Sequence, residues 1–454
     1  MEKQLNLFEL PECKTEAKKP PHEKLARKLK SPKRDQVEFH VQSLDETIPL
    51  DHQARTVWSF VELLNFKDFY KEFNSLEGSV GRALVDPKIL TSLWIYAICD
   101  GVISSRKIAK YCIENKAYAW ICGGVNVGHH LLSQFRSDFS SLFDNLVVQT
   151  IAFLNSKKLI TIKKVSQDGT KIQASASSSS MRRKKSLVSQ AIEVRKHIKV
   201  LEKQMSTGEF EKEEKKRKKQ ELDKAKAKKE KLIKAAQELQ KHKEGLNENR
   251  KKNRNRPLSN KAVSELRASS TDPECRKMKM SDHSYKPAYN VQIATDVDTE
   301  LVLKTSIHQN SHDGGQLLPM YSSLISTYDF DIDSYLVDSG FRNKEDFQEL
   351  FNDECLVCSP TKKKKTAALR KRVLEGNCEG DTQADQEWIR RMETEEANKL
   401  YNRRIRSSET INAFFANHGI RQFLVRGVEK VKGLIDLACL AYNMQIIKRL
   451  YEII

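Results

Sequence analysis

A lysine-rich segment in the middle of the chain places the strongest constraint on how this sequence can fold. Between Met181 and Arg256 there are 27 Lys and Arg residues against 12 Asp and Glu, a net charge of +15. Apolar residues recur in this segment at close to a 3.5-residue interval, before and after an interruption at Ser206-Thr207-Gly208. They are Val194, Ile198, Leu201, Met205, Leu222, Ala225, Leu232, Leu239 and Leu246. This spacing predicts two antiparallel helices that pack along one apolar seam and interrupt the core around them.

The overall charge indicates a polyanionic partner. The chain has 454 residues, enough for two or three domains, a net charge of +19 and an isoelectric point near 9.3. Lys and Arg that neutralise phosphates release condensed counterions, so this balance is typical of nucleic-acid binding. A second run, from Thr361 to Arg372, has seven Lys or Arg and no acid. Solvated helix faces are the alternative interpretation of both runs, but their uncompensated charge favours phosphate contact.

The cysteines and the apolar stretches predict the cellular compartment of the protein. The nine cysteines are odd in number and scattered, which is typical of free thiols in a reducing cytosol. Only Cys355 and Cys358 form a CxxC, and its apolar, strand-like setting favours structural thiols over a metal site. The N-terminus lacks the apolar core of a signal peptide, and the longest apolar stretches, 89–99 and 434–447, are too short or interrupted to cross a bilayer. We therefore expect a cytoplasmic, nucleoid-associated protein without membrane contact.

Helical patterns dominate the first third of the chain. We expect residues 1–40 to form a basic, disordered tail and residues 41–158 to form a helical DNA-binding domain. A break at Gly123-Gly124 precedes a polar helical stretch from Gly128 to Arg136. This order is typical of a helix-turn-helix, in which the second helix reads DNA, although an ordinary helical bundle has the same pattern. The residues of this stretch that we predict to bind DNA are His129, His130, Gln134 and Arg136.

From about residue 159 the spacing of apolar residues changes from that of helices to that of β-strands. Leu159 to Thr170 is rich in β-branched residues and ends at an Asp-Gly turn. Helical stretches alternate with the later strand patterns, so the expected fold class is an α/β core preceded by an all-α domain. The further strand patterns are 289–294, 301–307, 334–338 and 356–357. We assign the catalytic core to 159–180, 270–360 and 388–454, a basic, coiled-coil-like helical insertion to 181–269, and a basic loop insertion to 361–387.

Three acidic residues occupy positions from which their side chains could converge on a metal ion. Asp168 closes the first strand pattern, Asp338 closes the strand pattern before Ser339-Gly340, and Glu409 follows Ser407-Ser408, which would cap a helix. Carboxylates from separate elements are the ligands that Mg²⁺ prefers in enzymes that cleave phosphodiester bonds. Taken singly, each residue has a plainer interpretation, as a turn residue for Asp or as compensation of a helix dipole for Glu.

Together these segments resemble the three acidic motifs of bacterial insertion-sequence transposases of the DDE type. The matching segments are 165–171, 335–341 and the run Tyr401-Asn402-Arg403-Arg404 followed by Ser408-Glu409. With the helical stretch 86–139 and the closing run 421–443, the resemblance covers about 41–180 and 270–454. It implies a ribonuclease-H-like core in which Asp168, Asp338 and Glu409 ligate two Mg²⁺ ions, with Mn²⁺ as a substitute. Tyr401 and Arg404 would contact the DNA near the cleavage point, because Arg grips phosphate oxygens with two donors.

The third acid departs from the pattern of these transposases. They usually have three residues between the Arg and the Glu and a basic residue about seven positions after the Glu. Here four residues separate Arg404 from Glu409, and Ala416 occupies the later basic position. Glu395 and Glu396 are rivals for the role, but they lie in a Glu-rich stretch of solvated character.

The function that the resemblance implies is a Mg²⁺-dependent DNA transposase. Such an enzyme binds the ends of a mobile element on double-stranded DNA, cleaves there and joins the freed 3′ ends to target DNA, and we expect a homodimer on the DNA. A structure-specific nuclease on the same core and a non-catalytic nucleic-acid-binding protein are the alternatives. Inverted repeats around the gene would favour the transposase over the nuclease, and Mg²⁺-dependent nicking would exclude the binding protein.

Overall fold

The computed structural model describes residues 41–72, 84–207, 210–254, 256–361 and 366–451. The expected basic tail, residues 1–40, lies outside the described residues. From Leu44 onward the chain forms one compact unit. Among the described helices, none combines the length and the apolar character that crossing a bilayer requires.

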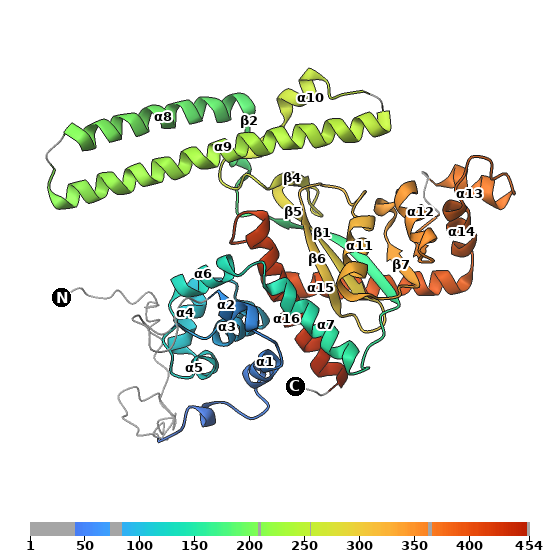
Figure 1. Cartoon of the computed structure of the whole chain (residues 1–454), viewed down its shortest axis with the longest axis horizontal. Helices are drawn as coiled ribbons and strands as arrows, with labels where there is room; N and C mark the ends of the chain where they lie inside the picture. Colours follow the sequence, from blue (N-terminus) through green and yellow to red (C-terminus); the bar gives the residue numbers. More distant parts are fainter. Residues whose placement is uncertain (1–40, 73–83, 208–209, 255, 362–365, 452–454) are drawn as a thin grey trace, which may run out of the picture. The chain divides into compact units, whose positions relative to one another are not determined.

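A helical region precedes the sheet (Figure 1). Its central helix begins with Pro87 at its first position, after Asp86, whose carboxylate accepts a hydrogen bond from the Lys88 N–H and so caps the helix. This helix is buried along most of its length, which makes it the core of the region. The helices are α1 (Gln53–Glu62), α2 (Lys67–Lys71), α3 (Pro87–Cys99), α4 (Ser105–Glu114), α5 (Lys116–Cys122), α6 (His129–Asp138) and α7 (Phe143–Ser156).

A six-stranded mixed sheet follows. Its long central strand, β5 (Tyr285–Asp296), pairs antiparallel with β1 (Lys164–Gln173) on one edge, and with β4 (Arg276–Lys279) and β6 (Val302–His308) on the other. β1 also pairs parallel with β7 (Ser334–Val337), which pairs parallel with β8 (Leu356–Cys358). The expectation of a helical N-terminal region and a mixed α/β core is confirmed. The short β4 was not expected, because its alternating Arg and Lys residues mask the strand pattern.

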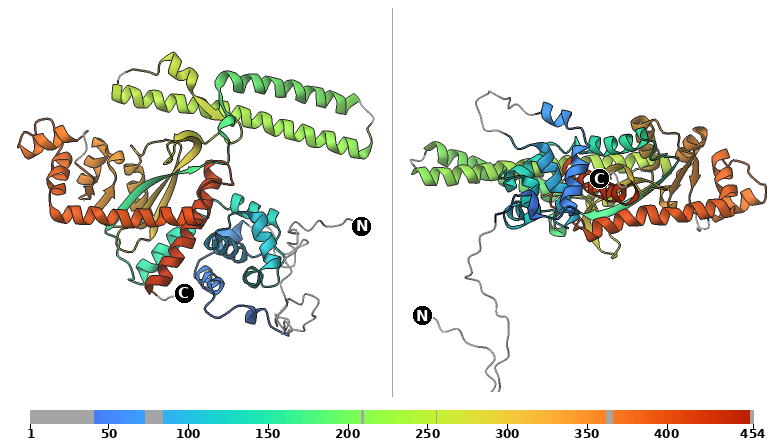
Figure 2. Two further views of the ribbon diagram at one scale, coloured as in Figure 1. Left: turned by 180° about the vertical axis from the view of Figure 1, so that it is seen from behind. Right: turned by 90° about the horizontal axis from the view of Figure 1, so that it is seen from below.

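Helices from the second half of the chain cover the sheet. They are α11 (Leu317–Tyr328), α12 (Lys344–Asn352), α15 (Glu395–Asn417) and α16 (Val428–Tyr451). α15 lies against β1, β5 and β7 (Figure 2, left). α16 packs on β6 and also on α3 and α7, and its Asn443 side chain bonds both the N–H and the carbonyl of Val302 at 2.8 Å. One continuous hydrophobic core therefore joins the helical region to the sheet.

Two long helices lie between the short strands β2 (Met181–Arg183) and β3 (Arg267–Ser269), which pair with each other. α8 (Lys184–Thr207) and α9 (Lys212–Arg254) run antiparallel and pack side by side (Figure 1). Their seam buries the apolar positions of the 3.5-residue repeat, among them Val194, Ile198, Leu201 and Leu232. The short α10 (Asn260–Glu265) follows.

Residues 361–387 do not form the loop that the sequence analysis expected. Within the described part of this range lie α13 (Ala367–Leu374) and the beginning of α14 (Gln383–Met392). Leu369, Val373 and Ala384 are buried, so these helices are held by tertiary packing. The many basic side chains masked the amphipathic pattern of these short helices. Short amphipathic helices are stable when their apolar faces pack against neighbouring elements.

Candidate functional site

Asp168 lies where β1 extends beyond its parallel neighbour. The pairing of β1 with β7 ends at Gln167 opposite Val337, whereas the pairing of β1 with β5 continues to Gln173. The expected Asp-Gly turn is therefore wrong, because β5 holds residues 168 and 169 in an extended strand. The Asp168 side chain is half-buried at this open end of the sheet.

Asp338 follows β7 and reaches the same end of the sheet. Since Gln167 pairs with Val337 in parallel register, the next residues of the two strands, Asp168 and Asp338, emerge side by side. The Asp338 carboxylate accepts a 2.6 Å hydrogen bond from the Ser339 N–H. We call Asp168 and Asp338 the acidic centre.

Helix α15 supplies the polar partners of Asp168. Arg404 donates from Nη2 to Asp168 Oδ1 at 2.8 Å, and its side chain is only 12% exposed. Asn412, two turns further along, donates from Nδ2 to Asp168 Oδ2 at 3.3 Å. Tyr401 is half-buried one turn before Arg404, so the structure brings both predicted DNA-contacting residues of α15 to the acidic centre.

Neighbouring charges act on the Asp168 carboxylate in opposite directions. Burial raises the pKa of Asp168 above its ordinary value, while the charge of Arg404 lowers it. The carboxylates of Asp313 and Asp338 raise this pKa further, because like charges disfavour ionisation. A cation at this place would relieve the repulsion between the carboxylates.

Glu409 is not brought to the two aspartates. α15 runs without a break through Ser407 and Ser408, so the expected helix start at these serines is wrong. Both serines are buried, and both hydroxyls donate to the Arg404 carbonyl inside the helix instead of capping it. Ser408 is one turn after Arg404 on the covered face, whereas Glu409 lies about 100° further round the helix and is exposed.

The rival acids lie at the beginning of α15. Glu395 is exposed and pairs with Lys399 at 2.7 Å, which is an ordinary ion pair along a helix surface. Glu395 and Glu396 occupy the first turn of α15, where negative charge suits the helix dipole.

A divalent cation fits the acidic centre in part. Two aspartates that emerge side by side at the end of a sheet supply the carboxylate oxygens that Mg²⁺ prefers as ligands. In the described part of the chain, no three His, Cys, Asp or Glu side chains lie close enough together to hold one ion. Asp168 and Asp338 are therefore the residues that would hold the cation, and the third protein ligand of the expected set is absent from this arrangement.

Asp313 is an acidic neighbour that the sequence analysis left out of the catalytic set. It lies in the loop between β6 and α11, and its Oδ1 accepts from Asn290 Nδ2 at 2.8 Å and from Gln292 Nε2 at 2.7 Å. A Cβ at Gly169 would collide with Asp313 Oδ1, so the residue after Asp168 has to be a glycine for this carboxylate to approach. In the sequence, the signals were this Asp-Gly pair and the polar pair His312-Asp313 near an expected strand, for which an indirect or structural role was favoured over metal ligation.

The predicted DNA-binding residues of α6 divide between the surface and the interior. His130 and Gln134 are exposed, and His129 is partly covered beside His130. Arg136 is only 5% exposed, with its guanidinium 4.4 Å from the centre of the Trp94 ring. Arg136 is thus a packing residue in this structure, because a guanidinium buried against Trp94 inside the helical region is not accessible to DNA.

The CxxC residues are both inside the protein. Cys355 precedes β8 and Cys358 ends it, and burial raises the pKa of the Cys355 thiol to about 12. Burial also raises the pKa of the Cys358 thiol. Protonated, buried thiols are poor metal ligands, so packing is the role that the structure supports.

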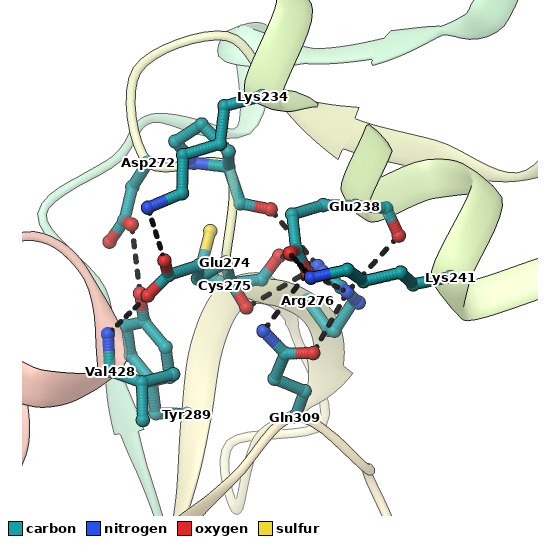
Figure 3. Close-up of polar contacts among 11 residues, drawn as sticks. Lys234, Glu238, Lys241, Asp272, Glu274, Cys275, Arg276, Tyr289, Gln309 and Val428 are labelled. Atoms are coloured by element: carbon teal, nitrogen blue, oxygen red, sulfur yellow. Dashed lines mark hydrogen bonds and ion pairs between the residues drawn. The ribbon is translucent and has the colours of Figure 1, made fainter. Parts of the chain in front are cut away.

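The basic helical pair is fixed to the sheet at one joint (Figure 3). Arg276 of β4 donates to Glu238 Oε2 of α9 at 2.9 Å, and both side chains are less than a tenth exposed. Lys234 of α9 pairs with Glu274, whose other oxygen accepts from the Val428 N–H at the beginning of α16. The joint holds α9 against the edge strand β4 and the beginning of α16.

Comparison with known protein families supplies independent findings. Residues 263–444 match the family model of a transposase DDE domain, and residues 42–138 match that of a transposase domain. The first range includes Asp338, Arg404 and Glu409, and the second includes most of the helical region. Among curated proteins and solved structures, none matches the chain.

Proposed function

Because the chain belongs to the DDE transposases of insertion sequences, we propose that it binds the ends of a mobile DNA element, cleaves phosphodiester bonds there and transfers the freed 3′ ends to target DNA. The observation that carries this proposal is the pair Asp168 and Asp338 at the shared end of β1 and β7, with Arg404 beside it. A DDE domain implies a ribonuclease-H-like core, and the mixed sheet with α15 along it is compatible with that fold.

The residues of the acidic centre have separate roles in this reaction. Asp168 and Asp338 would hold a divalent cation, Mg²⁺ or Mn²⁺. The cation would neutralise charge at phosphorus and activate the attacking oxygen. Arg404, now paired with Asp168, exchanges that carboxylate for a phosphate oxygen when DNA binds, because its planar fork fits either anion. Tyr401 covers the neighbouring turn, and Glu409 reaches the site only if α15 turns or bends.

DNA is held outside the acidic centre by two surfaces. His129, His130 and Gln134 of α6 are accessible enough to contact base edges or phosphates. The lysines of α8 and α9 provide affinity that does not depend on sequence, because Lys acts as a point charge towards phosphates. A homodimer would place two acidic centres on the two ends of one element.

Isosteric substitution of the acids tests the proposal. Asp168→Asn and Asp338→Asn keep the side-chain size but remove the charge, so we expect each to abolish cleavage of end-bearing DNA in Mg²⁺. DNA binding should persist or tighten, because negative charge near the phosphates is lost. The double variant should be no worse than either single one, since residues of one catalytic unit fail together. Normal cleavage by both single variants would contradict the mechanism.

Glu409→Gln tests the third acid separately, with Glu395→Gln and Glu396→Gln as matched variants on the same helix. Loss of cleavage with Glu409→Gln alone would support a rearrangement of α15 on DNA. Retained cleavage with Glu409→Gln, together with loss in one of the others, would reassign the third acid and leave the function intact.

A further inference from the structure

We propose that Asp313 is the third carboxylate at the acidic centre, where it acts as a positioning residue: its fixed negative charge strengthens the binding of a divalent cation by Asp168 and Asp338. This inference rests on the proposed function and deepens it. It concerns a residue in a loop between β6 and α11, outside the segments that carry the three acidic motifs.

The position of Asp313 is set by close backbone approaches. Its Oδ1 lies against Gly169, where any side chain would collide with it. Its Oδ2 lies on the side of Gly340, since a Cβ built there would be 3.8 Å from that oxygen. The carboxylate therefore lies between the residue after Asp168, which it approaches closely, and the turn after Asp338.

A chain of buried amides holds the carboxylate in place. The Tyr335 hydroxyl donates to Gln167 Oε1 at 2.9 Å, and Gln167 Nε2 donates to Gln292 Oε1 at 2.9 Å. Gln292 Nε2 then donates to Asp313 Oδ1 at 2.7 Å, and Asn290 donates to the same oxygen. The four donor residues are fully buried. The hydrogen-bond chain crosses β7, β1 and β5 and ends on Asp313 Oδ1. Each side chain in it is oriented by the one before, so the donors to this oxygen are held in place.

The charge of Asp313 is not cancelled locally. Within the described residues, its hydrogen-bond donors are neutral amides, and the structure gives it no ion pair with Lys or Arg. Arg404 is the cation paired with Asp168 across the sheet end. Because the Asp313 carboxylate lies against Gly169, the residue after Asp168, its charge repels that of Asp168, and a bound divalent cation would relieve this repulsion. A nearby fixed charge increases cation affinity in this way.

The test is the affinity of the full-length protein for Mn²⁺, measured by calorimetry without DNA. Asp313→Asn keeps an acceptor oxygen for both amide donors and loses only the charge. We expect Mn²⁺ to bind about 10- to 100-fold more weakly, with an unchanged urea midpoint. High Mn²⁺ should restore the cleavage rate, because the defect is in affinity. Asp331→Asn, an exposed aspartate before the opposite end of β7, is the matched control and should bind as the wild type does.

A second variant covers the case in which Asp313→Asn does not fold. Gln292→Met keeps the charge but breaks the amide chain, and we expect a smaller but measurable loss of Mn²⁺ affinity. If Asp313→Asn, or in its place Gln292→Met, binds Mn²⁺ as tightly as the control while Asp338→Asn does not, the inference is overturned and the proposed function stands. If the wild type binds no Mn²⁺ and cuts no DNA, the proposed function fails first.

Discussion

The joint between α9 and β4 offers a quantitative test of how the basic helices are attached. Glu238→Ala would leave the Arg276 guanidinium buried without its carboxylate, since the two side chains are 8% and 6% exposed. Removing one partner of a buried pair costs about 3–5 kcal/mol. Arg276 keeps the Pro273 carbonyl at 3.0 Å and Gln309 Oε1 at 2.9 Å as acceptors, so we expect a loss near the lower end, about 3 kcal/mol.

Urea unfolding of the full-length protein, followed by circular dichroism, measures this loss. Glu230→Ala, an exposed glutamate on the same helix, is the matched control and should cost less than about 0.5 kcal/mol. Replacing the pair together, Glu238→Leu with Arg276→Met, should recover most of the stability, because no unpaired charge remains. The reasoning would be refuted if Glu238→Ala and Glu230→Ala had the same free energy of unfolding. It would also be refuted if the double variant were less stable than Glu238→Ala.

Three further predictions follow from α9, from the helical pair and from α6. Burial lowers the pKa of His242 to about 4, so between pH 6.5 and 4 the unfolded chain takes up a proton that the folded chain does not. Stability should therefore fall by up to about 2 kcal/mol from pH 7 to pH 5, and His242→Gln should remove this part of the pH dependence of urea unfolding. Residues 195–229 carry fourteen Lys or Arg and seven Asp or Glu, and their deletion leaves the joint in place. This deletion should flatten the slope of log K against log salt for DNA binding, and an unchanged slope would refute the role of these helices. Gln134→Ala should weaken binding to element ends by about 1–3 kcal/mol more than to random DNA, whereas Arg136→Ala should instead lower the urea midpoint; equal loss on both DNAs would make Gln134 a phosphate contact.

The sequence was sufficient for the features that depend on local pattern. The apolar repeat around Leu201 and Leu232 predicted the seam of α8 and α9, because residues about 3.5 positions apart fall on one face of a helix. Strand patterns that end in Asp pointed to Asp168 and Asp338, since parallel neighbouring strands bring their ends together.

The features that the sequence did not reveal depend on tertiary contacts. Asp313 lies in a polar loop, and only the folded amide chain through Gln292 brings it to the acidic centre. Arg136 has the pattern of a surface residue, but Trp94, 42 positions earlier, offers a ring on which it stacks. The Ser407-Ser408 pair resembles a helix cap, yet the hydroxyls bond within the helix because α15 begins at Glu395 and continues beyond both serines.

The most direct test of the central claim is to map the products of end-bearing DNA. The full-length protein would be incubated with a duplex that carries one end of its own element and with target DNA, in Mg²⁺ or in EDTA. The account predicts cleavage at the end of the element, followed by products in which the freed 3′ end is joined to target DNA. It predicts neither product in EDTA or with Asp168→Asn. Cleavage that is equal in EDTA, or joined products formed by both Asp168→Asn and Asp338→Asn, would contradict it.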